Sequence, residues 1–203
     1  MNIQIIDNCI ENLYLDDILA LKNQRHAEFQ KTGIAKFTSE METVPDAYRL
    51  LQKKLNQQIT SKLIRMGHDM QSYQLTMSLL RISGSKYEGT LHHDKNANTR
   101  RKLTVILYLN APEEGGELAF PCYDRNKNPL NNALTARLNE LRDNNQYYDD
   151  DDEDDDVIDI KKVCTVEPIA NRAVMIDNLD PAAWHRGMKV RKGFKMAYIA
   201  FFE

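Results

Sequence analysis

Two histidines directly precede an aspartate in the segment TLHHDKN, residues 90–96, of a chain that has only five histidines. Imidazole nitrogens and carboxylate oxygens are common ligands of divalent metal ions. Successive side chains of an extended segment point to opposite faces, so His92 and Asp94 share one face and His93 points away from it. His92 and Asp94 are therefore candidate metal ligands, and we expect His93 to be exposed or hydrogen-bonded instead.

A metal site on this pair needs a third ligand from another part of the chain. The remaining histidines are His26, His68 and His185. The first two lie in predicted helices or at their ends, whereas His185 lies between two expected strands. A barrel would bring it opposite His92 and Asp94, and we predict that it completes the site.

Two imidazoles and one carboxylate leave half of an octahedron open, as in the non-haem Fe(II) oxygenases. A closed structural zinc site would need four ligands and usually thiolates. The three cysteines, Cys9, Cys122 and Cys164, are widely spaced and form no CxxC pair, so we expect them to be reduced and buried. A His-x-Asp pattern is often only a hydrogen-bonded pair in a loop, and the prediction of iron therefore needs further residues.

Lys195 begins the apolar run KMAYIAFF, ten residues after His185. A lysine that points into a barrel beside a metal is costly to bury unless an anion meets it. A dicarboxylate cosubstrate that chelates the iron would supply this anion. In the run LTVILY, Thr104, Ile106 and Tyr108 share one face, so the Tyr108 phenol is placed to donate a hydrogen bond to the same carboxylate.

The elements that must position these residues change in type along the chain. Apolar spacing predicts two helices, over 13–30 and over 45–66. From residue 74 onward come short apolar runs rich in β-formers, namely QLTMSLLRIS, LTVILYLN, GELAF, RAVMID and FKMAYIAFF. This order favours an α+β fold, with the N-terminal helices packed on one face of an antiparallel sheet or barrel.

Length and composition indicate one soluble domain, 1–203, with a mainly helical support over 1–73 and a barrel over 74–203. The net charge is −3, and no apolar run reaches the length of about eighteen residues that a membrane span needs. We therefore expect neither membrane insertion nor nucleic-acid binding. Acidic residues near the N-terminus argue against a secretory leader and favour a cytoplasmic location.

An insertion at about 121–159 separates two strand signals and is far longer than an ordinary connection. Its middle, LNNALTARLNELRDNN, is expected to contain a short helix, and eight consecutive acidic residues follow at 149–156. Removing these eight from the 30 acidic residues leaves 22 against 27 basic ones, so the rest of the chain is about +5. The run is interpreted either as a solvated, self-repelling loop or as an acidic flap that attracts a basic substrate or partner. A calcium loop is disfavoured, because the glycine and the spaced ligands are missing.

Taken in order, these pieces resemble the Fe(II)/2-oxoglutarate dioxygenases, and among them the prolyl 4-hydroxylase-like group. The matching motifs are H-x-D over 92–94, R-x-x-T-x-x-x-Y-L-N over 101–110, E-E-G-G-E-L-x-F over 113–120, P-x-x-x-R-A-V-M-I-D-N over 168–178 and H-x-G-x-x-V-x-x-G-x-K over 185–195. Five ordered motifs are far more specific than any one alone. The resemblance covers about 74–203, and the first 70 residues match only in being helical.

The resemblance implies a double-stranded β-helix, which is a distorted jelly-roll or cupin-like barrel, with iron and 2-oxoglutarate near one open end. It assigns six residues, three as catalytic metal ligands and three to cosubstrate binding: His92, Asp94 and His185, then Lys195, Tyr108 and Thr104. The implied cofactors are Fe(II), 2-oxoglutarate and O2, with ascorbate as an accessory reductant. Retention of Asp94 favours hydroxylation, because halogenating relatives replace this carboxylate with a small residue.

The implied activity is hydroxylation of an unactivated C–H, in first place of a peptidyl proline, with release of succinate and CO2. Three alternatives stay open: a hydroxylase of a free amino acid or other small metabolite, a noncatalytic binding module, and another metalloenzyme such as a zinc hydrolase. The last of these gives no role to Lys195.

Three further side chains have open interpretations. Arg81 precedes the metal segment and either binds substrate or pairs with the acidic insertion. For Arg101 a structural ion pair is favoured over a substrate contact. For Trp184, the only tryptophan, packing in the core or at the rim is favoured over a substrate contact.

Overall fold

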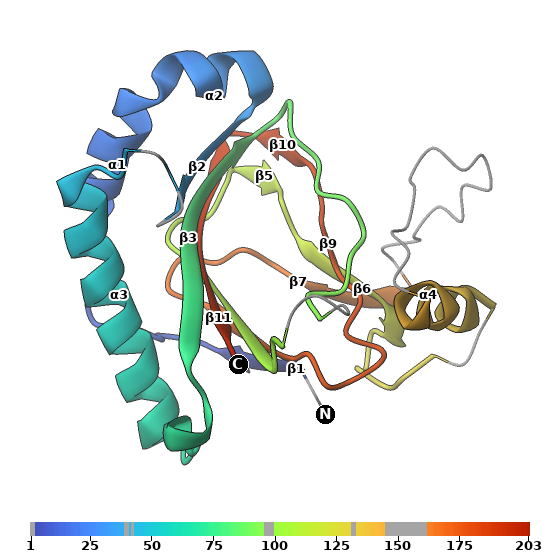
Figure 1. Ribbon diagram of the computed structural model, residues 1–203. Helices are drawn as coiled ribbons and strands as arrows, with labels where there is room; N and C mark the ends of the chain where they lie inside the picture. Colours follow the sequence, from blue (N-terminus) through green and yellow to red (C-terminus); the bar gives the residue numbers. More distant parts are fainter. Residues whose placement is uncertain (1–2, 39–40, 42, 96–99, 131–132, 145–161) are drawn as a thin grey trace.

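The structure is a computed structural model of the 203-residue chain, and it describes residues 3–38, 41, 43–95, 100–130, 133–144 and 162–203. Its largest unit is a six-stranded antiparallel sheet (Figure 1). The strand order is β1 (Ile3–Ile6), β8 (Ala173–Asp177), β4 (Leu103–Tyr108), β11 (Phe194–Phe202), β3 (Leu75–Gly84) and β2 (Ile34–Thr38). The last strand of the chain, β11, therefore lies inside the sheet, between β4 and β3.

Shorter strands lie across from this sheet and complete the barrel (Figure 1). The strand order of one group is β7 (Val163–Val166), β6 (Leu118–Asp124) and β9 (Arg186–Gly187), and the other group is β10 (Val190–Lys192) with β5 (Glu114–Gly115). Apolar side chains of β6 and β7 share one buried cluster with side chains of β4, β8 and β11. Two antiparallel sheets that enclose a common core are the arrangement of a jelly roll.

β11 is apolar on both faces because both faces are covered. Met196 and Tyr198 belong to the core cluster on the helical side, whereas Ala197 and Ile199 belong to the cluster inside the barrel. Successive side chains of a strand point to opposite faces. The run MAYIAFF, which follows Lys195, is therefore continuously apolar and does not alternate with polar residues.

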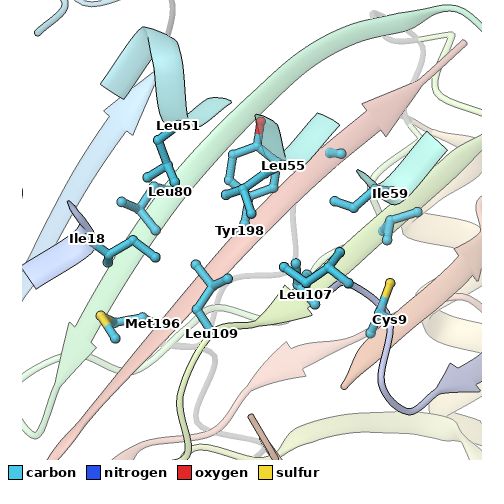
Figure 2. Packing of buried hydrophobic residues seen from close by; sticks show 14 of the residues in the cluster. Cys9, Ile18, Leu51, Leu55, Ile59, Leu80, Leu107, Leu109, Met196 and Tyr198 are labelled. Atoms are coloured by element: carbon cyan, nitrogen blue, oxygen red, sulfur yellow. The ribbon is translucent and has the colours of Figure 1, made fainter. Parts of the chain in front are cut away.

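Three helices cover the outer face of the large sheet (Figure 1): α1 (Leu15–Gln24), α2 (His26–Thr32) and α3 (Asp46–Arg65). The buried residues of α3 recur every three or four positions and form one apolar stripe: Tyr48, Leu51, Leu55, Ile59 and Leu63. Figure 2 shows this side of the sheet, where the stripe packs with residues such as Leu80, Leu107 and Tyr198. The helix predicted over 45–66 is confirmed.

The segment 13–30 contains two helices, although its spacing predicts one. The break is at Arg25, whose φ of −110° and ψ of 26° depart from helical geometry. The second helix ends at Gly33, which has a left-handed φ of 74°. A Cβ there would lie 2.5 Å from the Cβ of Lys86, so only glycine allows the chain to turn directly into β2.

Two strands of the large sheet, β1 and β2, lie in the first 73 residues, which the sequence predicts as a mainly helical support. β1 pairs with β8, and β2 pairs with β3. Both edges of the sheet therefore come from this part of the chain. Their segments, IQII and IAKFT, are too short for a decisive periodicity, which is why the sequence analysis missed them.

The insertion expected at about 121–159 contains the helix α4 (Ala133–Asp143), within the segment where a short helix is predicted. The acidic run 149–156 lies outside the described residues. Cys9, Cys122 and Cys164 are free and buried, as predicted. Among the described helices, none combines the length and the apolar character of a membrane span.

Leu55→Ala should lower the free energy of unfolding by about 2–5 kcal/mol, because it leaves a cavity between α3 and the sheet. Leu55 is 0% exposed, whereas Leu50 on the same helix is 62% exposed. Leu50→Ala is therefore the matched control, and it should change the stability by no more than about 0.5 kcal/mol. Urea unfolding followed by circular dichroism measures both variants. Equal losses would contradict the face that α3 presents to the sheet.

Candidate active site

His92 and His185 meet across a single antiparallel bridge. The backbone N–H of His92 donates to the carbonyl of His185 (3.1 Å), and the N–H of His185 donates to the carbonyl of His92 (2.9 Å). Directly opposed residues place their side chains on the same face, and the two ring centroids are accordingly 4.4 Å apart. A further hydrogen bond, from the Gly89 N–H to the carbonyl of Gly187 (3.0 Å), holds the two segments in register.

The carboxylate of Asp94 faces both rings. Its Oδ1 lies 3.6 Å from Nε2 of His92, and its Oδ2 lies 3.6 Å from Nε2 of His185. The donor atoms of all three residues lie within 4.8 Å of one another, and the described residues contain no other such group. The Nδ1 atoms of the rings are hydrogen-bonded to the carbonyls of Thr90 (2.9 Å) and Ala183 (3.0 Å). Each ring therefore presents Nε2 to a shared ion. The structure thus brings together the three residues that the sequence predicts as metal ligands.

His185 and Asp94 are held in the charge states that a metal ion binds. Burial lowers the pKa of His185, and the neighbouring His92 adds to this effect, so the imidazole is neutral. Burial by itself would raise the pKa of Asp94. Attraction to the two imidazoles in their protonated form, the hydrogen bond from Thr104 and the Arg101 guanidinium outweigh it and hold the pKa below its usual range. Asp94 is therefore a carboxylate at neutral pH.

A chain of hydrogen bonds fixes the orientation of Asp94. Oγ1 of Thr104 donates to Oδ2 of Asp94 (2.7 Å), and Nδ2 of Asn178 donates to Oγ1 of Thr104 (2.9 Å). Thr104 thus donates its hydroxyl proton to a metal ligand, Asp94. A contact of Thr104 with the cosubstrate stays a prediction. The sequence analysis assigned no role to Asn178. The sequence feature that could have indicated a role is the position of Asn178 directly after a strand of the barrel.

Arg101 also supports Asp94. Its Nη1 lies 3.9 Å from Oδ1 of Asp94, and its guanidinium carbon lies 3.9 Å from the centre of the Phe201 ring. This geometry agrees with the structural ion pair that the sequence analysis favours, reinforced by a cation–π contact.

The other histidines do not contribute to the cluster. His93 points away from it, as the alternation predicts, and its Nε2 lies 3.0 Å from the carbonyl of Asp180. It packs edge-on against Trp184 at 5.8 Å between centroids, and Trp184 is a core residue, as predicted. His26 lies in α2 and His68 follows α3, so both belong to the helical layer.

A cavity of about 250 Å³ adjoins the cluster inside the barrel. Lys195 lines it and is only 8% exposed, and its Nζ donates a hydrogen bond to the carbonyl of Gly116 (2.7 Å). Burial, reinforced by the charge of Arg81 and opposed by Glu117, lowers the pKa of Lys195 to about 8. An ammonium group has three donors, so Lys195 can bind an anion in addition to Gly116.

Tyr108 contributes a second donor to the same cavity. Its hydroxyl is buried, and it has no hydrogen-bond partner among the described residues. Burial raises the pKa of the phenol, which therefore keeps its proton. Nζ of Lys195 lies 5.9 Å from the centre of the Tyr108 ring. A buried donor without a partner is costly, and a carboxylate bound by the phenol and the ammonium would satisfy both. The residues present therefore fit one end of a dicarboxylate such as 2-oxoglutarate.

His185→Ala should weaken the binding of Mn(II) or Fe(II) by more than about 100-fold, because one of three ligands is lost. Thr104→Val removes the hydrogen bond to Asp94 but keeps the side-chain shape, and it should weaken metal binding by about 10–100-fold. The matched control is His26→Ala, which changes an exposed histidine of α2 and should bind as the wild type does. Calorimetric titration under argon measures all three. An unchanged affinity in His185→Ala would contradict the metal site.

A family model described as the 2OG-Fe(II) oxygenase superfamily matches residues 77–203. This range contains all six residues that the sequence analysis assigns to the metal and the cosubstrate. The family description also names the metal and the cosubstrate that were predicted. No curated protein matches the chain.

Solved structures match the fold of nearly the whole chain. A 2OG-Fe(II) oxygenase family oxidoreductase from Burkholderia pseudomallei aligns with a TM-score of 0.62 at 11% identity, covering 100% of this chain and 84% of that one. A second match is the viral collagen prolyl hydroxylase of Paramecium Bursaria Chlorella virus-1, in a 2OG complex. It aligns with a TM-score of 0.52 at 16% identity, covering 100% of this chain and 95% of that one. A third match is a Trichoplax adhaerens prolyl hydroxylase in complex with a hypoxia inducible factor oxygen degradation domain peptide fragment. It aligns with a TM-score of 0.52 at 16% identity, covering 99% of this chain and 83% of that one.

At these identities the likeness shows the fold, and it confirms the predicted double-stranded β-helix with N-terminal helices. The family match is independent of this likeness and extends over more than half of the sequence. The chain therefore belongs to the 2OG-Fe(II) oxygenase superfamily.

Proposed function

We propose that this oxygenase hydroxylates a prolyl residue of a peptide or protein, with 2-oxoglutarate as cosubstrate and release of succinate and CO2. The proposal is carried by the convergence, inside one barrel, of a three-ligand metal cluster with a buried ammonium and a buried phenol. The prolyl substrate is supported by the viral and Trichoplax neighbours, which are prolyl hydroxylases, one of them with a bound peptide fragment.

Each group of the site has one task in this proposal. His92, Asp94 and His185 would hold Fe(II), while Lys195 and Tyr108 would bind the distal carboxylate of 2-oxoglutarate. Bound together, iron and 2-oxoglutarate supply the oxidising power that converts an unactivated C–H into an alcohol. Asp94 occupies the position that a halide would need, which favours hydroxylation over halogenation.

The chain itself supplies orientation and a shielded environment. Apolar side chains line the cavity beside the metal ligands: Leu79, Ile106, Leu118, Ile199 and Phe201. They exclude water from the reacting centre, and a medium of lower dielectric constant strengthens the attraction between Lys195 and a carboxylate.

The alternatives from the sequence explain fewer of these contacts. A noncatalytic barrel has no need for intact metal ligands together with a buried phenol, that of Tyr108, which has no partner among the described residues. A zinc hydrolase gives no role to Lys195. A basic partner for the acidic run 149–156 and a cytoplasmic location also belong to the proposal, and both rest on the sequence alone.

Wild-type protein with Fe(II) and O2 should convert 2-oxoglutarate to succinate, and a proline-rich peptide should stimulate this turnover. Mass spectrometry should find one added oxygen atom in the peptide. The control His26→Ala should retain the turnover, and His185→Ala should abolish it. Stimulation by free proline alone would favour the small-metabolite alternative. If 2-oxoglutarate is not converted at all, with or without a peptide, the noncatalytic binding module becomes the better explanation.

The affinity for 2-oxoglutarate should fall as the pH rises through the pKa of Lys195, which is about 8. Burial depresses this pKa, so the ammonium loses its proton above pH 8 and can no longer pair with the carboxylate. The dissociation constant should therefore rise about 10-fold between about pH 7 and pH 9. Lys195→Arg keeps its charge over this range, so its dissociation constant should not depend on pH. Titrations of Mn(II)-loaded protein without O2 measure both proteins.

Lys195→Ala provides the complementary control in the same titrations. It should weaken 2-oxoglutarate binding far more than Mn(II) binding, because Lys195 contacts the cosubstrate and not the metal. Equal loss of both affinities, or a wild type whose affinity does not depend on pH, would contradict the role of Lys195.

A further inference from the structure

Arg81 is a second cation in the cavity that contains Lys195. It lies on β3 opposite Ala197 of β11, and Ala197 lies opposite Tyr108 of β4. Opposed residues of antiparallel strands share a face, so Arg81, Ala197 and Tyr108 form one row across the cavity wall. All three line the cavity, and the middle position carries only a methyl group.

The guanidinium of Arg81 has no carboxylate partner among the described residues. Its Nε is buried and makes no hydrogen bond with any residue that the structure describes. Other arginines of the protein are paired: Arg172 with Asp7 at 2.7 Å and Arg191 with Glu114 at 2.6 Å. A buried cationic donor without a partner is destabilising. A ligand that brings an anion to Arg81 therefore binds more tightly than one that brings a neutral group.

The proposed cosubstrate does not supply this anion. 2-Oxoglutarate has two carboxylates: one would bind the metal as part of a chelate, and the other would bind Lys195 and Tyr108. Arg81 then keeps its positive charge on the same wall of the cavity. The remaining component of the reaction that can carry a carboxylate is the substrate.

A further cation continues this row towards the edge of the sheet. Lys36 of the edge strand β2 lies directly opposite Arg81, and therefore on the same face. Partial desolvation, together with the charge of Arg81, lowers the pKa of Lys36. Lys36 is exposed whereas the Nε of Arg81 is buried. The two cations thus extend from the surface to the cavity, and their repulsion is relieved when an anion binds.

We propose that Arg81 is a substrate-binding residue that receives a carboxylate of the substrate, with Lys36 as its outer neighbour. The proposal deepens the proposed function and rests on it, because it makes the substrate an anionic one. The carboxylate comes from one of two sources. It is either the side chain of an aspartate or glutamate beside the target proline, or the α-carboxylate of a free amino acid.

Matched pairs of ligands test this on the full chain, loaded with Mn(II) and 2-oxoglutarate without O2. One pair is a capped peptide with either Asp or Asn before a proline, and the other pair is L-proline and L-prolinamide. Broadening of the ligand's proton NMR signals by Mn(II) gives its affinity without turnover. In the wild type, the carboxylate member of at least one pair should bind about 10-fold more tightly than its amide. The pair that discriminates identifies the source of the carboxylate.

Variants assign this preference to Arg81. Arg81→Met should remove it, Arg81→Lys should retain part of it, and Lys36→Met should weaken it less than Arg81→Met does. Arg49→Met is the control for the lost charge, because Arg49 is exposed on α3, and it should retain the preference in full. The affinity for 2-oxoglutarate should not fall in any of the four.

Three outcomes would overturn the proposal. The first is a wild type without preference in either pair, as expected if the acidic run 149–156 already paired with Arg81. The second is a preference that survives in Arg81→Met. The third is a loss of 2-oxoglutarate affinity in Arg81→Met, which would assign Arg81 to the cosubstrate.

The same samples separate this proposal from the proposed function. If the wild type binds no 2-oxoglutarate, the proposed function fails. The ligand pairs are then titrated on protein loaded with Mn(II) alone, and the difference between wild type and Arg81→Met still decides whether Arg81 binds a carboxylate.

Discussion

The carboxylate of Asp94 lies almost wholly out of water, at 6% exposure, between two imidazoles. A buried charge is costly unless opposite charges or hydrogen bonds compensate it. Thr104 and Arg101 provide part of this compensation, and a divalent ion bound by the same oxygens would provide the rest. The protein thus keeps its metal-binding carboxylate ionised and oriented in the folded state.

The strand β11 links the helical layer to the cavity. Lys195 and Ala197 line the cavity, while Met196 and Tyr198 pack on the helical side. Because the two sets alternate along one strand, the packing of α3 on the outer face also fixes the position of the buried ammonium. The N-terminal helices do not contribute metal ligands, but they give the cavity wall the rigidity that a preorganised site needs.

Local patterns predict the long and strongly apolar elements well. The runs of β3, β4, β8 and β11 and the spacing of α3 are each decided by many residues. Prediction failed where few residues carry the signal, as for β1 and β2, and where one residue, Arg25, interrupts a continuous helical pattern. For the site, alternation separated His92 and Asp94 from His93. Asn178 was missed because its role depends on a neighbouring strand and not on its own segment.

The sequence by itself determined which donor atoms are available, which face of a strand each occupies and which family motifs they form, because these properties depend on residues close together in the chain. Only the tertiary structure decided that His185 lies opposite His92, that Thr104 uses its proton on Asp94 and that Arg81 has no carboxylate beside it among the described residues. Those facts depend on the pairing register of strands that are far apart in the chain, and no local pattern sets that register.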